Sequence, residues 1–352
     1  KIGLNQKVLG GSRVFGQIGK YSIGALNIHT NANTDNPATS YSAFRFRSDI
    51  RKRTTIGAVV TDVSNKNIQN SVIGIDAQMR FWGNSSFSTW FSQAQDTEFE
   101  KPSSSSMIKL DLRNDRYFFT TGQHRVDKNF DPALGFVQRK DMIGTGAIAG
   151  FTPRVGDGND LIRQWILSLY VRDVKNQSGI HETGVLQFSI DALFESRDRV
   201  GVKVINNKEK LINDFTLGNG VKILKGNYSD KLFLFNARTN QSRSFWGDFN
   251  FTNGKYFGGN KVSWSGSLGR RFSNHLTVYL SGNQNIISIP NKEKFSANVY
   301  AIIIEGALNK KWFNKAIVQY DNFSEEVQLY FRINWIHTPG SDLFIVKIID
   351  IN

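Results

Sequence analysis

The sequence predicts an all-β protein, a transmembrane antiparallel up-and-down β-barrel of about 20 strands. Three observations predict it. Segments in which apolar and polar residues alternate with a period of two recur from one end of the chain to the other. Many of these segments are around ten residues long, the length that a tilted strand needs to cross a membrane. Short turns alternate along the chain with longer polar loops, as they do in outer-membrane barrels.

Each of the clearest strand segments has one apolar and one polar face. In segment 184–196, Leu186 and Phe188 alternate with Gln187 and Ser189. Successive side chains of an extended strand point to opposite faces, so this segment predicts a strand with two unlike sides. The same alternation occurs in segments 42–49, 71–81, 106–115, 261–270 and 326–335.

The apolar faces are expected to contact lipid. A closed soluble barrel of this size could not fill its interior with side chains, because barrel diameter grows with strand number. A propeller would show blade repeats, and a sandwich of so many long strands normally splits into modules. Aromatic residues near the strand ends suit the interfacial girdles of a membrane barrel. The residues expected to face lipid are Leu186, Phe188, Ile190, Phe194, Leu329, Phe331 and Ile333.

The polar faces are expected to line a wet lumen. A lining of mixed charge can join neighbouring strands through ion pairs, or it can set up a field that draws anionic solutes. Both roles are open from sequence alone, and the net charge of +14 favours anions if the pore is open. The lumen-lining candidates are Arg45, Arg47, Asp76, Arg80, Lys109, Asp111, Arg113, Arg172, Asp191 and Arg332.

The composition restricts the possible chemistry. The 352 residues include no cysteine, which excludes disulfides, thiolate metal sites and thiol nucleophiles. There is no apolar run of about 18 residues that would form a membrane-spanning helix. The basic residues are scattered at strand-like spacing, and the one dense cluster, 47–53, fits a turn between two strands, so no nucleic-acid partner is expected. No composition break divides the chain, which predicts a single barrel domain over 1–352.

Segment 130–142 is the most irregular stretch. It combines a proline, a glycine and a basic pair with apolar residues. One hypothesis is that it folds inward as a plug or constriction, and the alternative is a loop packed on the rim. The residues assigned to the possible plug are Phe130, Asp131, Pro132, Phe136 and Arg139.

No motif indicates catalysis, a cofactor or a metal. The five histidines are dispersed, and His181 lacks the second histidine of a zinc-protease helix. No Gly-x-Ser-x-Gly elbow occurs, and the glycine-rich segment 144–150 reads as a strand because no helix follows it. Weak calcium binding by Asp157 and Asp160 is less favoured than a solvated turn. The sequence therefore predicts neither an enzyme nor a cofactor or metal site, with a barrel hydrolase as a minor alternative.

Three segments resemble one known family. They are "LGGSRVFGQIGKYSIGALNIHT", "FDPALGFVQRKDM" and "VQYDNFSEEVQLYFRINWIHTPGSDLFIV". They are similar to the large β-barrel domain that follows a family-9 carbohydrate-binding-like domain in outer-membrane proteins of Gram-negative bacteria. The resemblance implies the same fold and location. The family's upstream domain is absent from this sequence, so sugar binding is not carried over to these residues.

The predicted role is a passive pore or a scaffold in an envelope complex, with a link to glycan uptake suggested by the resemblance. The first alternative is a non-conducting anchor for a carbohydrate-binding or partner domain upstream of Lys1. The expected location is the bacterial outer membrane, reached by export with the signal peptide removed. The expected partners are outer-membrane lipid, lipopolysaccharide and other envelope proteins.

Overall fold

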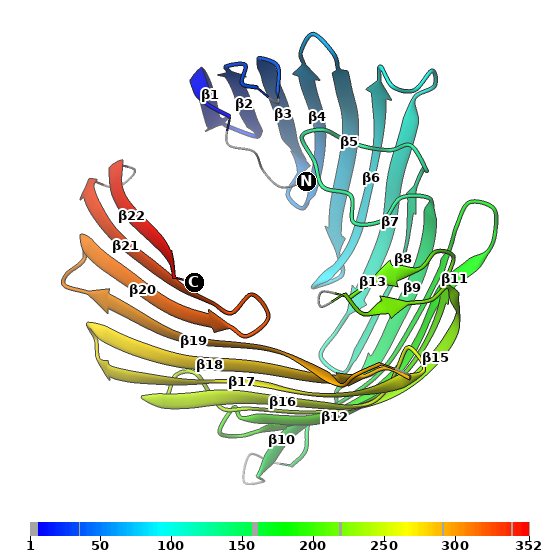
Figure 1. Ribbon diagram of the computed structural model, residues 1–352, viewed down its shortest axis with the longest axis vertical. Helices are drawn as coiled ribbons and strands as arrows, with labels where there is room; N and C mark the ends of the chain where they lie inside the picture. Colours follow the sequence, from blue (N-terminus) through cyan, green and yellow to red (C-terminus); the bar gives the residue numbers. More distant parts are fainter. Residues whose placement is uncertain are drawn as a thin grey trace. The chain divides into compact units, whose positions relative to one another are not determined.

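The computed structural model describes residues 6–34, 36–156, 161–217, 220–290, 292–338 and 341–351, and these residues form strands, turns and loops. Lys1, Asp157 and Asp160 lie outside the described residues. Within the described ranges 20 strands form one sheet, and two short strands, β13 and β14, form a separate hairpin (Figure 1). The prediction of an all-β chain with about 20 antiparallel strands is confirmed.

The chain contains two compact units. Unit 1 comprises Lys1–Ala149 and Tyr170–Thr183, and unit 2 comprises Gly150–Leu169 and Gly184–Asn352. The prediction of a single domain over the whole chain stays a prediction. Strands β9 (Met142–Phe151), β10 (Ile162–Lys175) and β11 (His181–Phe194) contribute residues to both units.

Unit 1 is a run of antiparallel hairpins, in which β1 to β8 each pair with the next strand along the chain. Short turns join β3 to β4 and β5 to β6, so each register follows from the local connection. The strands are β1 (Val8–Ile18), β2 (Tyr21–Thr30), β3 (Thr39–Arg51), β4 (Thr54–Ser64), β5 (Gln69–Phe81), β6 (Ser85–Asp96), β7 (Ser103–Arg113) and β8 (Tyr117–Val126).

Unit 2 continues in the same way from β12 to β22, with the β13–β14 hairpin inserted between β12 and β15. The strands are β12 (Arg199–Leu211), β13 (Phe215–Thr216), β14 (Lys222–Ile223), β15 (Gly226–Arg238), β16 (Phe245–Tyr256), β17 (Gly259–Ser273), β18 (Leu276–Ser288), β19 (Phe295–Ala307), β20 (Trp312–Asp321), β21 (Glu326–Thr338) and β22 (Ser341–Ile351).

The register gives each unit one apolar face. In unit 1, Phe44, Val60 and Ile73 pair directly across β3, β4 and β5, and their exposed fractions are 45%, 44% and 57%. In unit 2 a row of apolar residues crosses six consecutive strands. This row consists of Leu268, Leu280, Ile302, Val318, Leu329 and Ile349.

The opposite face of each unit is called the polar face here. In unit 1 it carries Arg47 and Asp76, which align through Gly57 of β4. In unit 2 it carries amide and hydroxyl side chains in register across β15 to β18. This row consists of Asn236, Asn250, Ser265 and Asn283.

The buried apolar clusters of both units lie under loops rather than between two sheets. One is centred on Phe130 in unit 1, and the other on Ile223 in unit 2. From their polar composition alone, residues 206–229 would form one of the long loops between strands. Strand β12 continues to Leu211 and β15 begins at Gly226, so the loop is shorter and contains a hairpin of its own.

Candidate functional site

The structure brings most of the lumen-lining candidates onto the polar face. In unit 1 the register aligns Arg47 with Asp76, and Arg80 with Asp111 through Ser86. Lys109 pairs with Ser88 on the same face. The period of two then places Arg45 beside Arg47 and Arg113 beside Asp111. Of the others, Arg172 lies exposed on β10 in unit 1, and Asp191 and Arg332 lie in unit 2.

The residues predicted to face lipid form two groups by exposure. Leu186, Phe188 and Phe331 expose 45%, 46% and 45% of their surface. Phe188 alternates with Ser189, which is only 4% exposed, so β11 has one open and one covered side. The remaining members of the predicted set are partly exposed, and they are Ile190, Phe194, Leu329 and Ile333.

An ion pair on the polar face of unit 1 spans a whole strand. Arg45 on β3 donates to both carboxylate oxygens of Asp76 on β5, at 2.5 and 2.9 Å. Gly57 on β4 lies between them, and a Cβ atom there would come within 2.5 Å of the guanidinium and 2.7 Å of the carboxylate. The absence of a side chain at Gly57 therefore lets strands that are not neighbours join through a bidentate pair.

Asp191 forms the corresponding link in unit 2. Its side chain is 5% exposed, and it accepts a hydrogen bond from Arg199 Nε at 3.0 Å. Asn236 on β15 donates to the same oxygen at 3.4 Å across β12, where the intervening residue is Gly201. A Cβ atom at Gly201 would overlap the Asp191 carboxylate. A buried charge is stable here because it has both an ionic partner and a second donor.

Several basic residues of the polar face lack an acidic partner within the part of the chain that the structure describes. Among the described residues, no ion pair involves Arg80, Lys109 or Arg113, whereas Arg332 lies over the ring of Phe344 at 4.4 Å. Unpaired cations on a concave or narrow surface leave a net positive potential. The polar face thus combines strand-joining ion pairs with excess positive charge, which are the two roles left open by the sequence.

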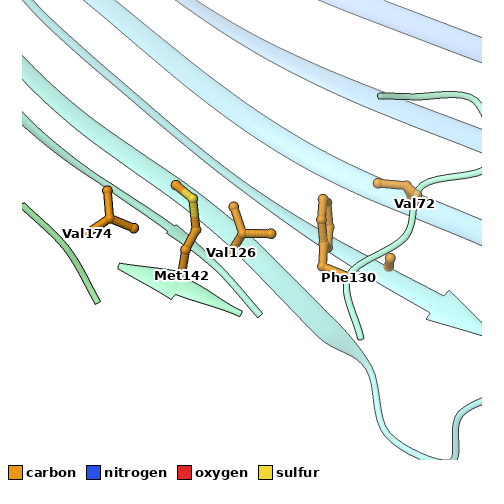
Figure 2. Close-up of a cluster of buried hydrophobic side chains, with 6 residues drawn as sticks. Val72, Val126, Phe130, Met142 and Val174 are labelled. Carbon is orange, nitrogen blue, oxygen red and sulfur yellow. The ribbon is translucent and has the colours of Figure 1, made fainter. Parts of the chain in front are cut away.

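The β8–β9 loop, residues 127–141, folds onto the polar face of unit 1. Phe130 is 5% exposed and belongs to a buried cluster that also includes Val72 of β5, Val126 of β8 and Val174 of β10 (Figure 2). Val72 lies on the same face as Asp76 and near the start of its strand. The loop therefore covers the strand ends on the polar side of the sheet.

Hydrogen bonds hold this loop in place. The amide of Asn70, 2% exposed, donates to the carbonyl of Asp131 at 2.8 Å, and its oxygen accepts from the backbone of Ala133 at 2.9 Å. Lys140 pairs with the Asp131 carboxylate at 2.8 Å. Because one buried side chain satisfies both a donor and an acceptor of the loop, Asn70 is its main polar anchor.

The other plug candidates differ in their contacts. Arg139 forms an ion pair with Glu182 and donates to the Thr183 hydroxyl at 2.9 Å. Pro132 is partly exposed, whereas Phe136 is 90% exposed and does not belong to the buried cluster. The segment is thus fastened at both ends, and Val137 between them packs against the cluster.

Asp127 fastens the start of the loop through its carboxylate. It accepts hydrogen bonds from Ser104 N at 2.9 Å, Ser104 Oγ at 2.7 Å and Gln177 Nε2 at 2.7 Å. Burial acts to raise the pKa of Asp127, but these bonds and one from Arg125 outweigh it and leave the pKa below its ordinary value of 3.8. The arrangement favours the charged form.

Acid is expected to release the loop. Because the folded pKa of Asp127 lies below the unfolded one, its contribution to stability is complete above the ordinary value of about 3.8 and is lost as pH falls through the lowered pKa. Amide hydrogen exchange in residues 127–141, followed by mass spectrometry, should therefore rise below that pH. The Asp127→Asn variant should lose this component of the acid response. An identical acid profile in wild type and variant would contradict the assignment.

A second loop covers the polar face of unit 2. Ile223 of the β13–β14 hairpin is 2% exposed and packs with Ile287 of β18, while Phe215 of β13 makes an edge contact with Phe257 at 5.3 Å. This hairpin is not predicted by the sequence pattern. The sequence feature that could have indicated it is a group of apolar residues inside an otherwise polar loop, namely Leu217, Val221 and Ile223.

No catalytic or metal-binding arrangement is found among the described residues. Within those ranges no three His, Asp or Glu residues are grouped to hold a metal ion. Ser105 Oγ lies 3.4 Å from His124 Nε2, but the serine is 2% exposed and its hydroxyl donates to the carbonyl of Arg125 at 2.9 Å. This pair is a structural contact, because a nucleophile must reach a substrate. Membrane-spanning helices are likewise not found in the described part of the chain.

Comparison with known proteins gives no family assignment. No family model and no curated protein matches the sequence. OmpT, an outer membrane protein of Vibrio cholerae in its trimer form, aligns with a TM-score of 0.40 at 9% identity, covering 95% of this chain and 96% of OmpT. The ferric-catecholate import receptor Fiu from E. coli K12 gives 0.42 at 8% identity, covering 95% and 69%. The copper transporter OprC gives 0.38 at 8% identity, covering 95% and 66%. The resemblance to the carbohydrate-binding-associated family stays a prediction.

Proposed function

We propose that the chain is an outer-membrane β-barrel whose polar face lines a passive pore that prefers anions. One observation carries the proposal: each unit exposes a continuous apolar face and places its ion pairs on the other. The row from Leu268 to Ile349 crosses six strands without a polar residue. Soluble monomers rarely expose contiguous apolar patches of more than a few hundred Å². In an outer membrane, hydrocarbon would contact the apolar face and water would contact the polar face.

Anion preference follows from the cations for which the described residues supply no acidic partner. Arg80, Lys109 and Arg113 share the polar face of unit 1, and cationic rings or rows in a pore favour anions. The β8–β9 loop covers part of the polar face of unit 1, and the β13–β14 hairpin covers part of the polar face of unit 2. Outer-membrane lipid and lipopolysaccharide are the proposed surroundings of the apolar face, and other envelope proteins are its proposed neighbours. The proposal includes no enzymatic activity.

Planar bilayers test the pore directly. The refolded chain should form steps of conductance, and the reversal potential in a KCl gradient should indicate chloride preference. A chain that inserts but never conducts would support the alternative, a non-conducting anchor for a binding domain. A chain that stays monomeric and soluble without detergent would overturn both. A link to glycan uptake, suggested by the family resemblance, would appear as a drop in current when oligosaccharide is added.

Freeing the β8–β9 loop is expected to widen the pore. The Asn70→Ala change removes the donor to Asp131 and the acceptor for Ala133, two hydrogen bonds that each contribute about 0.5–1.5 kcal/mol to holding the loop in place. Mean conductance should rise and its noise should increase. Asn67→Ala is the matched control, because Asn67 lies exposed in the preceding loop. Unchanged conductance in Asn70→Ala, with hydrogen exchange showing the loop released, would show that the loop is no constriction.

A further inference from the structure

A basic depression lies at the short-turn end of the polar face of unit 1. It has a volume of about 990 Å³, near the upper end of the range for small-molecule sites. The β3–β4 turn and the β5–β6 turn border it. We call it the basic basin. Its charged lining consists of Arg47, Asp49, Arg51, Lys52, Arg53 and Arg80.

The charges of the basic basin are unbalanced. Asp49 is the one carboxylate among the lining residues, and it lies 4.0 Å from Arg47, the outer limit for an ion pair. Arg53 donates to the carbonyl of Gly83 at 3.4 Å, a long bond that leaves its charge uncompensated. No acidic partner of Arg51 or Arg80 occurs among the residues that the structure describes.

Neutral hydrogen-bond donors accompany these cations. Thr55, Gln78 and Ser86 line the same depression. Thr55 pairs with Gln78 across β4 and β5, and Ser86 pairs with Arg80 across β5 and β6. Hydroxyl and amide donors beside guanidinium groups match the several oxygens of an oxyanion such as phosphate.

We infer that the basic basin is a binding site for a soluble oxyanion with more than one negative charge, of the phosphate or pyrophosphate class. Five cationic side chains against one carboxylate favour a multivalent ligand over chloride, because the attraction scales with ligand charge. The site lies on the polar face, away from the apolar surface, which favours a solute over a lipid headgroup. The inference goes beyond the proposed function, since binding at this site requires no conduction.

Calorimetric titration of the detergent-folded full chain with inorganic pyrophosphate tests the site. Binding is expected to saturate. Its affinity should fall as salt is added, because salt screens the charges of the basin. The double variant Arg47→Gln/Arg80→Gln should bind about a hundredfold more weakly, since each of the two charge-assisted hydrogen bonds that it removes contributes about tenfold. The control Lys310→Gln/Lys311→Gln removes the same charge from an exposed turn in unit 2 and should bind as wild type does.

Three results would overturn the inference. Binding that is not saturable would mean that no site exists. Equal loss of affinity in the Lys310/Lys311 control would mean that net charge, not the basin, attracts the anion. Binding confined to vesicles containing an anionic phospholipid, and lost in the Arg47/Arg80 variant, would assign the basin to a lipid phosphate instead. Because no current is measured, failure here is distinct from failure of the pore.

Discussion

Replacing Phe188 with arginine is expected to lower the free energy of unfolding in a lipid bilayer by about 2–4 kcal/mol, the cost of a cationic side chain on the lipid face near the midplane. Phe188 lies in the middle of β11, is 46% exposed, and belongs to the face opposite Ser189 and Asp191. In hydrocarbon the guanidinium cannot keep its hydration shell. Denaturant titration of the chain folded into phospholipid vesicles measures the difference.

Gln187→Arg is the control for this substitution. Gln187 is the preceding residue and points to the polar face, where water and other charged side chains are available. A change of about 0.5 kcal/mol is expected there. If Phe188→Arg were as mild as Gln187→Arg, the exposed side of β11 would face water, and the lipid assignment of the whole apolar face would be wrong.

Most of the fold could be predicted from local pattern. The period of two fixes which side chains share a face, and this requires only that the segment be extended. For this reason segments 71–81 and 326–335 were placed correctly as β5 and β21, apart from small differences at their ends. The basic cluster 47–53 was read as a turn, whereas β3 continues through it to Arg51. Strand ends depend on cross-strand partners, which the local pattern does not contain.

The contacts of the candidate site depended on register and could not be predicted in this way. Arg45 and Asp76 are 31 residues apart and sit on strands that do not pair with each other. Only the combined register of β3, β4 and β5 places Gly57 between them. The β13–β14 hairpin was missed for a similar reason, since its apolar residues are too few to show a period and become buried only against residues of other strands of unit 2.

On the polar face, contacts between strands that are not neighbours cross the intervening strand at a glycine, where there is no side chain to block them. Gly57 and Gly201 each lie beneath a polar link that crosses their strand. An aromatic contact crosses β17 in the same way. Gly269 of β17 aligns with Trp246 on one side and Tyr279 on the other, and the rings of these two residues meet edge to face with their centroids 5.7 Å apart. A side chain at such a position would fill the space that the crossing contact uses, so the glycine is required by its surroundings rather than by its backbone angles.

Gly201→Ala is therefore expected to destabilise the chain by about 1–3 kcal/mol, the usual cost of overpacking a filled site. The added methyl group would overlap the buried Asp191 carboxylate and separate it from Arg199 and Asn236. Gly184→Ala, whose Cβ would meet Lys208 at an ordinary 3.7 Å, should change stability little.

The cause of this effect can be isolated with a double-mutant cycle. In an Asp191→Ala background the two closest contacts of a Cβ atom at Gly201 are gone and Asn236 Oδ1 at 3.0 Å remains. The second change to alanine should therefore cost much less than it does in the wild type, giving a coupling energy between the two sites of about 1 kcal/mol or more. Arg199 tolerates the loss of its partner because its side chain is 44% exposed and can turn to water. If the losses in free energy of unfolding of the two single variants add up in the double variant, measured in lipid vesicles, Gly201 is required for another reason. The contact across β12 would then not depend on the absence of a side chain at position 201.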